Sequence, residues 1–330
     1  MLEILHLPVE LQNDDDNLVY CAHQNEYNGT MIFRNPQRIE IKYQPVEQNQ
    51  IGRGGTAVVH HAFWPAGGRC IALKNAGFNT GAREVAILEY FDRLEDYQRN
   101  HIIKMIAYGK HEDRMYIAME RGDVMIGNYV NDDRSNLYNI LKGAARALEQ
   151  FHHPHSKGLD ELSRMTPKSA RLDDFEQNYD LLNLCWSTEL FVLLRRVYAI
   201  HLDIKQSNFV VSLEQNHGNE IAIKLIDFGT SVLLDNAGSA SLNILAQMHK
   251  APEIRNDNRN RQGNISLKVD VWAFGIMSCQ QLHGRGCLQL DPDYRPTMNV
   301  IVRFFDGNCH GFRYERELGL EIDDEEIWCD

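Results

Sequence analysis

Short hydrophobic runs separated by turn residues dominate the chain between residues 39 and 120. The runs are rich in β-branched and aromatic residues, and the turns between them include GRGG and PAGG. Runs of this kind, bounded by glycine and proline, are typical of β-strands. The pattern therefore predicts strands at residues 39–46, 56–64, 69–76, 104–109 and 114–120. Residues 1–39 are polar and have no clear period, so we expect an N-terminal extension there.

The hydrophobic spacing becomes helical elsewhere in the chain. Val85, Leu88 and Phe91 recur every three residues, which predicts one helix over residues 81–94. The same period predicts further helices over residues 135–153, 270–283 and 298–305. The order of these elements predicts an α+β fold. A β-rich N-terminal lobe with one main helix (residues 40–122) is followed by a mostly helical C-terminal lobe (residues 123–330).

Charge and cysteine content narrow the class of partner and the compartment. The 330 residues include 34 Lys and Arg against 46 Asp and Glu, a net charge of −12. Binding to a nucleic acid needs a basic face, so we expect no nucleic acid partner and a basic protein partner instead. The seven cysteines are odd in number and form no CxxC pair, which favours reduced thiols in the cytoplasm or nucleus.

Two further features of the sequence concern membranes. The first residues, MLEILHLPVE, lack the basic flank and the sustained apolar run of a signal peptide. The most apolar segment, residues 189–200, is interrupted by Arg195 and Arg196 and is too short to span a bilayer. We therefore expect a soluble intracellular protein with no membrane span.

The loop HLDIKQSN, residues 201–208, holds three side chains that suit phosphoryl transfer. An aspartate such as Asp203 can accept the proton of a substrate hydroxyl. Lys205 can neutralise charge on the transferred phosphate, and the Asn208 amide can bind Mg²⁺. Taken alone, the same residues also fit a polar surface loop between two strands.

A second acidic side chain follows this loop at a short distance. Asp227 in KLIDFG lies 19 residues after Asn208, across a predicted β-hairpin formed by FVVS and EIAIKLI. A carboxylate at the end of a strand, followed by Phe-Gly, suits a Mg²⁺ ligand. Because of this spacing, the two motifs HLDIKQSN and KLIDFG together indicate phosphoryl transfer much more specifically than either motif alone.

The glycine-rich turn IGRGGTAVV precedes these residues and suits phosphate binding. Gly52 and Gly54 have no Cβ, so backbone N–H groups there can approach a phosphate. Lys74 in IALK follows at a distance from which it can reach the α- and β-phosphates. Glu84 lies on the core-facing side of the predicted helix, where its carboxylate can form an ion pair with Lys74.

Two structural motifs complete the set. The motif APE includes Glu253, and DYRPT places Arg295 where it can pair with that carboxylate. The motif DVW places Asp270 at the start of a predicted helix, where it can accept N–H bonds from the loop at residues 201–208.

With these seven motifs in order, the chain resembles the eukaryotic protein kinase family from about residue 45 to about residue 305. The resemblance implies a two-lobed fold, the use of ATP and Mg²⁺, and phosphate transfer to protein hydroxyls. It makes Asp203 the catalytic base, with Lys205, Lys74 and Glu84 as further catalytic residues, and makes Asn208 and Asp227 the metal ligands. The residues that it implies for nucleotide binding are Ile51, Gly52, Arg53, Gly54, Gly55, Val59, Ala72, Lys74, Met119, Glu120 and Gly122. Two subfamilies share local features with this chain: the monopolar-spindle dual-specificity kinases and the mitogen-activated kinase kinase kinases.

Several positions depart from the family pattern. Leu202 replaces an arginine that pairs with a phosphorylated activation-loop residue in many members, so phosphorylation at Ser239 or Ser241 would lack that charge-assisted bond. Ala57 replaces the third glycine of the turn, which adds only a methyl group. Ala246 replaces a threonine before APE, and the loss of this hydroxyl bears on peptide phosphorylation more than on ATP binding.

Segment lengths also depart from the family. About forty extra residues, roughly 157–197, precede the loop at 201–208, whereas the region near residues 284–290 is shortened. Residues 315–330 form an acidic tail. Either a specialised function or an imperfect gene model would account for the altered lengths.

Three functions stay open from the sequence. The first is an active Ser/Thr or dual-specificity protein kinase, and the second is a nucleotide-binding pseudokinase that acts as a scaffold. The third is a phosphotransferase for small molecules, which the APE and DVW motifs disfavour. The histidines at 152, 153 and 155 allow a metal site, but histidines at a helix end near backbone carbonyls are the simpler interpretation.

Overall fold

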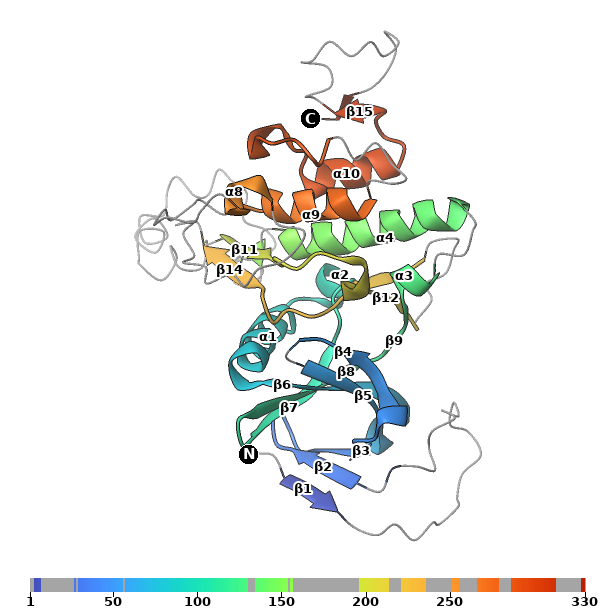
Figure 1. The fold of residues 1–330 in the computed structure, drawn as a ribbon, viewed down its shortest axis with the longest axis vertical. Helices are drawn as coiled ribbons and strands as arrows, with labels where there is room; N and C mark the ends of the chain where they lie inside the picture. Colours follow the sequence, from blue (N-terminus) through green and yellow to red (C-terminus); the bar gives the residue numbers. More distant parts are fainter. Residues whose placement is uncertain are drawn as a thin grey trace, which may run out of the picture. The chain divides into compact units, whose positions relative to one another are not determined.

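Two compact units make up the fold in the computed structural model (Figure 1). The first unit comprises Met1–Gln150 with Lys205–Ser231, and the second comprises Phe151–Ile204 with Val232–Asp330. The structure describes residues 3–6, 27, 29–55, 57–129, 134–153, 155–156, 196–213, 221–235, 251–255, 266–278, 286–312 and 328–329. The expected lobe boundary near residue 122 stays a prediction.

An eight-stranded antiparallel sheet is the larger of the two sheets in the first unit. Its strands are β1 (Glu3–His6), β2 (Gly29–Phe33), β3 (Ile39–Tyr43), β4 (Gln50–Arg53), β5 (Ala57–Trp64), β6 (Arg69–Gly77), β7 (Met105–His111) and β8 (Arg114–Glu120). The strand order is β1-β2-β3-β5-β6-β8-β7, and β4 pairs with β5. All five strands predicted from the hydrophobic pattern are present. The sheet also includes β1, β2 and β4, which the sequence pattern did not indicate as strands.

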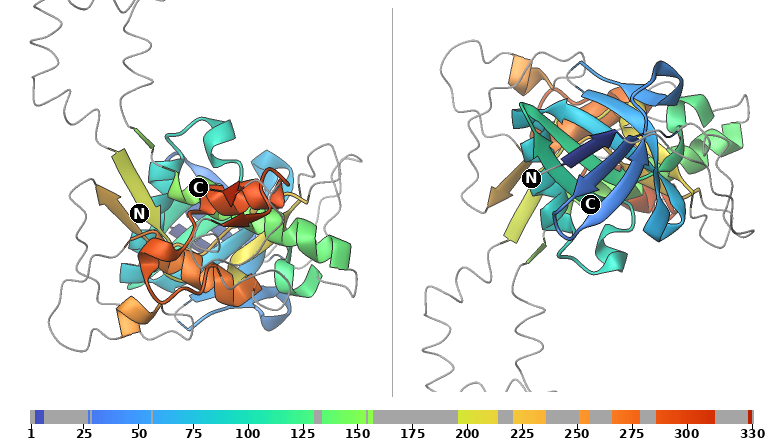
Figure 2. Two further views of the ribbon diagram at one scale, coloured as in Figure 1. Left: turned by 90° about the horizontal axis from the view of Figure 1, so that it is seen from above. Right: turned by 90° about the horizontal axis from the view of Figure 1, so that it is seen from below.

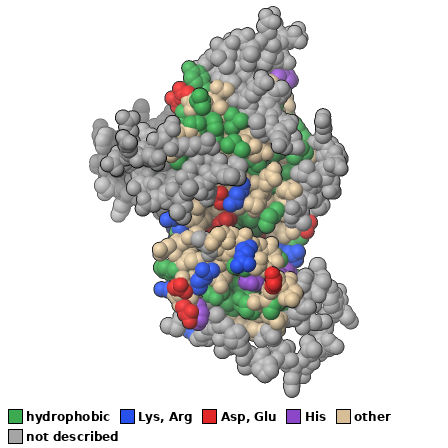
Figure 3. Space-filling model, in the orientation of Figure 1, with side chains coloured by type: hydrophobic (Ala, Val, Ile, Leu, Met, Phe, Trp, Pro, Cys, Tyr) green, Lys and Arg blue, Asp and Glu red, His purple; other side chains and the backbone are tan. Residues whose placement is uncertain are grey.

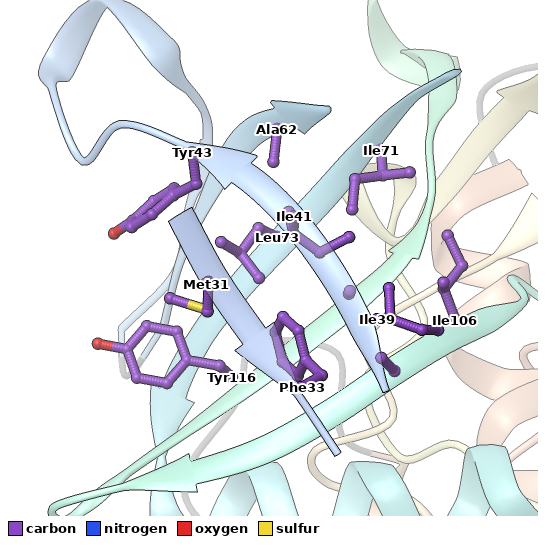
Figure 4. Close-up of a cluster of buried hydrophobic side chains, with 12 residues drawn as sticks. Met31, Phe33, Ile39, Ile41, Tyr43, Ala62, Ile71, Leu73, Ile106 and Tyr116 are labelled. Atoms are coloured by element: carbon purple, nitrogen blue, oxygen red, sulfur yellow. The ribbon is translucent and has the colours of Figure 1, made fainter. Parts of the chain in front are cut away.

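The sheet curls so strongly that β2 approaches β7. A β-bridge joins Asn35 to Tyr108, and the Tyr108 N–H donates to the Asn35 carbonyl at 3.1 Å. Seen from below, the blue to green strands cross one another at a steep angle (Figure 2), as expected of twisted strands. The curled sheet encloses a cluster of buried side chains (Figure 4). The cluster consists of Met31, Phe33, Ile39, Ile41, Tyr43, Ala62, Ile71, Leu73, Ile106, Ala107, Tyr116 and Ala118.

One main helix, α1 (Phe78–Phe91), packs against β6, β7 and β8 (Figure 1). Val85, Leu88 and Phe91 are buried on its inner side, which confirms the predicted period. Gly81 lets the helix approach the sheet closely, because a Cβ there would lie 2.4 Å from the Cβ of Met115. A short helix, α2 (Asp96–Arg99), follows.

A smaller sheet and a long helix complete the first unit. The sheet order is β13-β12-β9, with β9 (Gly122–Met125), β12 (Phe209–Ser212) and β13 (Ile223–Leu225). The β12–β13 pair confirms the predicted hairpin. The helices are α3 (Ile126–Tyr129), α4 (Arg134–His152) and the 3₁₀ turns at Glu47–Asn49, Pro65–Gly67 and Gln206–Asn208. The last two residues of α4 belong to the second unit.

The second unit contains helices and two small sheets. Its strands are β10 (His155–Ser156), β11 (Arg196–Ile200) and β14 (Val232–Asp235), in the order β10-β11-β14, and the pair β15 (Gly311–Phe312) and β16 (Trp328–Cys329). Its helices are α8 (Pro252–Arg255), α9 (Lys268–Ser278), α10 (Met298–Phe305) and the 3₁₀ turn Pro292–Tyr294. Thr297 caps α10 by accepting a bond from the Val300 N–H at 3.3 Å. The α+β class is confirmed, and α10 has the predicted bounds.

Charges of both signs occur together on the face drawn in Figure 3, where Lys, Arg, Asp and Glu side chains lie among hydrophobic ones. No described helix is long and apolar enough to cross a membrane.

Cysteine pairing differs from the sequence prediction at one position. Cys309 is disulfide-bonded, whereas Cys70 and Cys287 form no disulfide. The prediction of reduced thiols rested on spacing along the chain, and spacing does not report which cysteines meet in the fold.

Several expectations fall on residues outside the described part of the chain. They concern Ser239, Ser241 and Ala246, nearly all of the 157–197 segment, and most of the acidic tail.

Candidate active site

A cavity of about 350 Å³ in the first unit brings together most of the residues singled out in the sequence. Its walls come from the β4–β5 hairpin, β6, the end of β8, β9 and the segment around β12 and β13. All of the predicted nucleotide-binding residues line it except Gly55. Lys205, Glu84, Asn208 and Asp227 line it as well. Asp203 lies in the second unit and is described with that unit below.

Lys74 holds two carboxylates at the inner end of this cavity. Its Nζ lies 2.6 Å from Glu84 Oε2 and 2.7 Å from Asp227 Oδ1. Lys74 is 4% exposed and Glu84 is completely buried. The strand β6 fixes the lysine, because it pairs with β5 on one side and β8 on the other. The predicted ion pair between Lys74 and Glu84 is therefore present.

Burial and charge act in opposite directions on this cluster. Burial alone would lower the pKa of Lys74, but the charges of Glu84 and Asp227 outweigh it and raise the pKa. The pKa of Glu84 is raised by its complete burial, and Lys74 offsets part of that shift. Lys74 therefore stays charged, and it stabilises an acidic side chain that would otherwise favour protonation.

Asp227 adopts an unusual backbone conformation directly after β13. Its φ is 66°, in the left-handed region that L-residues rarely occupy. The Ile226 N–H donates to the Asn208 carbonyl at 3.0 Å, and the fully buried Phe228 follows Asp227. Strain of this kind costs on the order of 1–3 kcal/mol and occurs often at functional sites. The conformation directs the Asp227 carboxylate to Lys74 while leaving 41% of the side chain exposed.

Oxygen ligands for a divalent cation occur at the same cavity. Asn208 is buried at the end of a 3₁₀ turn, and its N–H donates to the Lys205 carbonyl at 3.0 Å. Mg²⁺ prefers carboxylate and carbonyl oxygens and usually keeps several waters. The exposed part of the Asp227 carboxylate and the Asn208 amide in the same wall fit that preference.

The glycine-rich turn forms the tip of the β4–β5 hairpin. The Gly54 N–H donates to the Ala57 carbonyl at 2.8 Å, which closes the turn. A Cβ at Gly55 would meet nothing within 4 Å, so the space beside the turn is open. Backbone N–H groups beside open space can approach a phosphate.

In the second unit, Asp270 organises the loop that contains Asp203. Its carboxylate accepts the His201 N–H at 2.7 Å and the Leu202 N–H at 2.8 Å. It also contacts His152 Nε2 at 3.0 Å. Leu202 has a φ of 66°, so these bonds hold the backbone in a left-handed conformation just before Asp203. The predicted role of Asp270 is confirmed.

His152 has a structural contact where the sequence had also allowed a metal site. It is buried and bonds to Asp270. The described residues contain no group of three or more His, Cys, Asp or Glu side chains able to hold a metal ion.

The predicted pair between Glu253 and Arg295 is also present in the second unit. Arg295 Nη1 and Nη2 lie 2.6 and 2.8 Å from the two oxygens of Glu253. Arg295 also donates to backbone carbonyls, including that of Gln289 at 2.8 Å, and is only 2% exposed. A bidentate pair with satisfied donors fixes α8 near the start of α9.

Some contacts of the site were missed by sequence reasoning. Asp123 lines the cavity, and Arg83 donates to the Gly229 carbonyl at 3.2 Å. Lys224 Nζ lies 2.6 Å from Glu120 Oε1. Their only sequence signal is proximity to motif residues, because no fixed spacing identifies them.

Comparison with known proteins finds sequence similarity to protein kinases. The family model described as "Protein kinase domain" matches residues 193–303. The chain is 22% identical over 243 residues to "Serine/threonine-protein kinase ste20" of Aspergillus oryzae, covering 72% of this chain and 22% of that protein. It is 19% identical over 284 residues to "Cysteine-rich receptor-like protein kinase 28" of Arabidopsis thaliana, covering 82% and 34%. It is 22% identical over 293 residues to "Titin homolog" of Caenorhabditis elegans, covering 89% and 1%.

Coverage of these relatives is partial. The matched region spans 22% and 23% of the length of two Aspergillus relatives. The similarity therefore concerns only part of each of these relatives.

Proposed function

Because the chain is a distant relative of the eukaryotic protein kinases, we propose that it transfers the γ-phosphate of ATP to serine or threonine hydroxyls of proteins. The observation that supports this most is the buried cluster of Lys74, Glu84 and Asp227 at one cavity. A buried cation held by two carboxylates beside oxygen ligands suits a triphosphate with its metal ion.

The cavity suits a nucleotide at both of its ends. Apolar walls from Val59, Ala72 and Met119 would contact the base, while Lys74 would bind phosphate oxygens. Asn208 and Asp227 would hold Mg²⁺, which would neutralise charge on the transferred phosphate. Glu84 keeps Lys74 in position, and the glycine-rich turn would bind phosphates through its backbone N–H groups.

Asp203 and Lys205 would act on the second substrate. Asp203 would accept the hydroxyl proton of the substrate, and Lys205, two residues later and in the cavity wall, would neutralise phosphate charge. We further propose a basic protein substrate, in line with the net charge of −12. A cytoplasmic or nuclear location is part of the same proposal.

A nucleotide-binding scaffold is the second candidate function. Leu202, where many kinases have arginine, packs against the apolar cluster of Ile200, Ala251 and Val269. Its side chain therefore serves packing and offers no partner for a phosphorylated loop.

The decisive experiment measures phosphate transfer and nucleotide binding separately. For the full chain, we expect labelled phosphate to enter a general basic protein, and Asp203→Asn to reduce that rate by about 10²–10⁴-fold. Equal rates for wild type and Asp203→Asn would contradict the assigned base.

Thermal unfolding with Mg·ATP distinguishes the alternatives. Stabilisation by Mg·ATP without transfer to any protein would support the scaffold function. Much faster transfer to sugars or amines than to proteins would instead indicate a small-molecule phosphotransferase.

A further inference from the structure

Two additional cavities lie next to each other in the first unit. One, of about 360 Å³, is bordered by α2, the start of β6, the end of β8 and residues of β12 and β13. The other, of about 250 Å³, lies between α4 and the segment that leads into β13. Both are lined by Asn100, His101 and Ala222, so they adjoin. We call the combined feature the α2–α4 groove, after the two helices that border it.

Positive charge dominates the walls of this groove. The first cavity is lined by Arg69, Arg99, Lys104 and Lys224, against Asp96 and Glu120. The second is lined by Lys142 and Arg146, which both also have partners within the protein. On a chain of net charge −12, such a local excess of cations is unusual. It indicates an anionic ligand, since like charges gathered at one place repel one another.

Part of this charge is neutralised within the protein and part is accessible. Arg99 is 4% exposed and pairs with Asp92, and Lys224 pairs with Glu120 at 2.6 Å. Lys104 is different, because its Nζ lies 3.9 Å from Asp96 Oδ1 and the two side chains are 54% and 94% exposed. An ion pair this long between exposed side chains contributes little to stability, so the charge of Lys104 stays available to a ligand.

Arg69 adds a second accessible cation to the first cavity. Its guanidinium lies 5.5 Å from the centre of the Trp64 ring, and the residue is exposed. Contact with an aromatic face leaves the N–H groups at the guanidinium edge available for an anion.

The second cavity depends on a close contact between α4 and the start of β13. Lys142 and Arg146 are four residues apart on α4, so they lie on one face. Gly143 lies between them, and a Cβ there would be 2.6 Å from Ile223 Cγ1 and 2.8 Å from the Ile221 carbonyl oxygen. Gly143 thus allows the α4 backbone between the two cationic residues to lie directly against the start of β13.

Hydrogen bonds make the groove a preformed site. The His101 N–H donates to Gln150 Oε1 at 2.7 Å, and His101 Nδ1 bonds to the Ile223 carbonyl at 2.8 Å. Gln150 Nε2 donates to the Tyr97 carbonyl at 3.0 Å and to Asn100 Oδ1 at 2.7 Å. These bonds join α2, α4 and β13, so little ordering is required on binding. Burial lowers the pKa of His101, which keeps it neutral near pH 7.

We propose that the α2–α4 groove binds an acidic peptide segment of a partner protein. A single compact anion would not use both cavities, whereas an extended chain with several carboxylates would. Exposed Tyr97 and Leu213, 72% and 54% exposed, adjoin lining residues Asp96 and Ser212 in sequence and offer apolar contacts. A nucleic acid fits less well, because the molecule as a whole is strongly negative.

The test is a binding measurement on the full chain without ATP, so it is independent of kinase activity. A fluorescently labelled peptide of Glu, Asp and Leu residues is titrated and its anisotropy recorded. Wild type should bind, and Lys104→Glu/Lys142→Glu should weaken binding by about tenfold or more, because like charges would then face each other. Arg38→Glu is the matched control, since Arg38 is exposed in the β2–β3 turn and lines neither cavity.

Thermal unfolding shows whether the double variant is folded. The milder double variant Lys104→Gln/Lys142→Gln, which removes the charges without reversing them, should also weaken binding of the acidic peptide. Equal affinity of wild type and folded double variant would overturn the proposal, as would an equal loss in Arg38→Glu. Tighter binding of pyrophosphate, a single-stranded oligonucleotide or phosphatidylserine vesicles than of the peptide would overturn the assigned ligand class.

Discussion

At the scale of single residues, Lys74 is the centre of the candidate active site. It forms an ion pair with Glu84, and Glu84 has no exposed surface. Removing one member of a buried ion pair leaves its partner charged and poorly solvated. The stability of the first unit and the nucleotide chemistry proposed for it would therefore depend on the same side chain.

We expect Lys74→Met to lower the free energy of unfolding by about 3–5 kcal/mol at pH 7, because it leaves Glu84 buried without its cation. Urea denaturation measures this change. The double variant Lys74→Met/Glu84→Gln should recover part of the loss, since a neutral amide costs less to bury. If the loss of unfolding free energy in the double variant equalled the sum of the losses in Lys74→Met and Glu84→Gln, the two residues would not interact.

The same variant should show a specific pH dependence. The folded-state pKa of Glu84 is raised by burial, so protonation favours the folded state. The stabilisation from protonation is fully present below the unfolded pKa of about 4.3 and is lost as pH rises through the folded pKa. The destabilisation by Lys74→Met should therefore be smaller near pH 5 than at pH 7. A destabilisation that grows on acidification would contradict this view of Glu84.

At the scale of elements, the position of α1 depends on one glycine. Gly81 faces Met115 of β8 so closely that any Cβ would require movement. Glu84 lies one turn later on the same helix, so a displacement of α1 would also shift the partner of Lys74. The contact between helix and sheet therefore positions the ion pair.

We expect Gly81→Ala to destabilise the protein by about 1–3 kcal/mol, although alanine is the better helix former, because overpacking outweighs propensity. Chemical denaturation gives the value. Gly55→Ala is the control, because a Cβ at Gly55 would meet nothing within 4 Å, and its effect should stay within about 0.5 kcal/mol. A neutral or stabilising effect of Gly81→Ala would mean that the helix has room to move.

Local pattern predicted elements better than it predicted their arrangement. The strand β8 and the helix α10 have the bounds that hydrophobic period and turn residues indicated. The pairing of β1 and β2 into the sheet was not predictable, since it depends on contacts between distant residues such as Asn35 and Tyr108. Motif spacing indicated Lys74 and Asp227 but not the left-handed backbone at Asp227, which tertiary contacts impose on an ordinary residue.

At the scale of the whole molecule, the net charge and the local charges have opposite signs. The chain carries −12, whereas the α2–α4 groove gathers cations at one place. A long-range negative field attracts basic proteins, and a cationic groove selects acidic segments only at short range. If both proposals hold, a basic substrate and an acidic partner would therefore bind separate surfaces of the molecule.

The attraction of a basic substrate to the molecule and the attraction of an acidic peptide to the α2–α4 groove should respond differently to changes of charge. Raising ionic strength from about 0.1 to 1 M shortens the screening length from about 10 to 3 Å. We expect kcat/KM for a basic protein substrate to fall over this range while kcat changes little, because salt weakens the encounter of enzyme and substrate more than it affects the chemical step.

The double variant Lys104→Glu/Lys142→Glu makes the molecule more negative. It should leave kcat/KM for the basic substrate unchanged or raise it, and it should weaken the binding of the acidic peptide. Steady-state kinetics and peptide anisotropy on the same preparation measure both quantities. If the double variant lost activity toward the basic substrate and peptide binding in equal proportion, one surface would serve both ligands, and the separation argued here would be wrong.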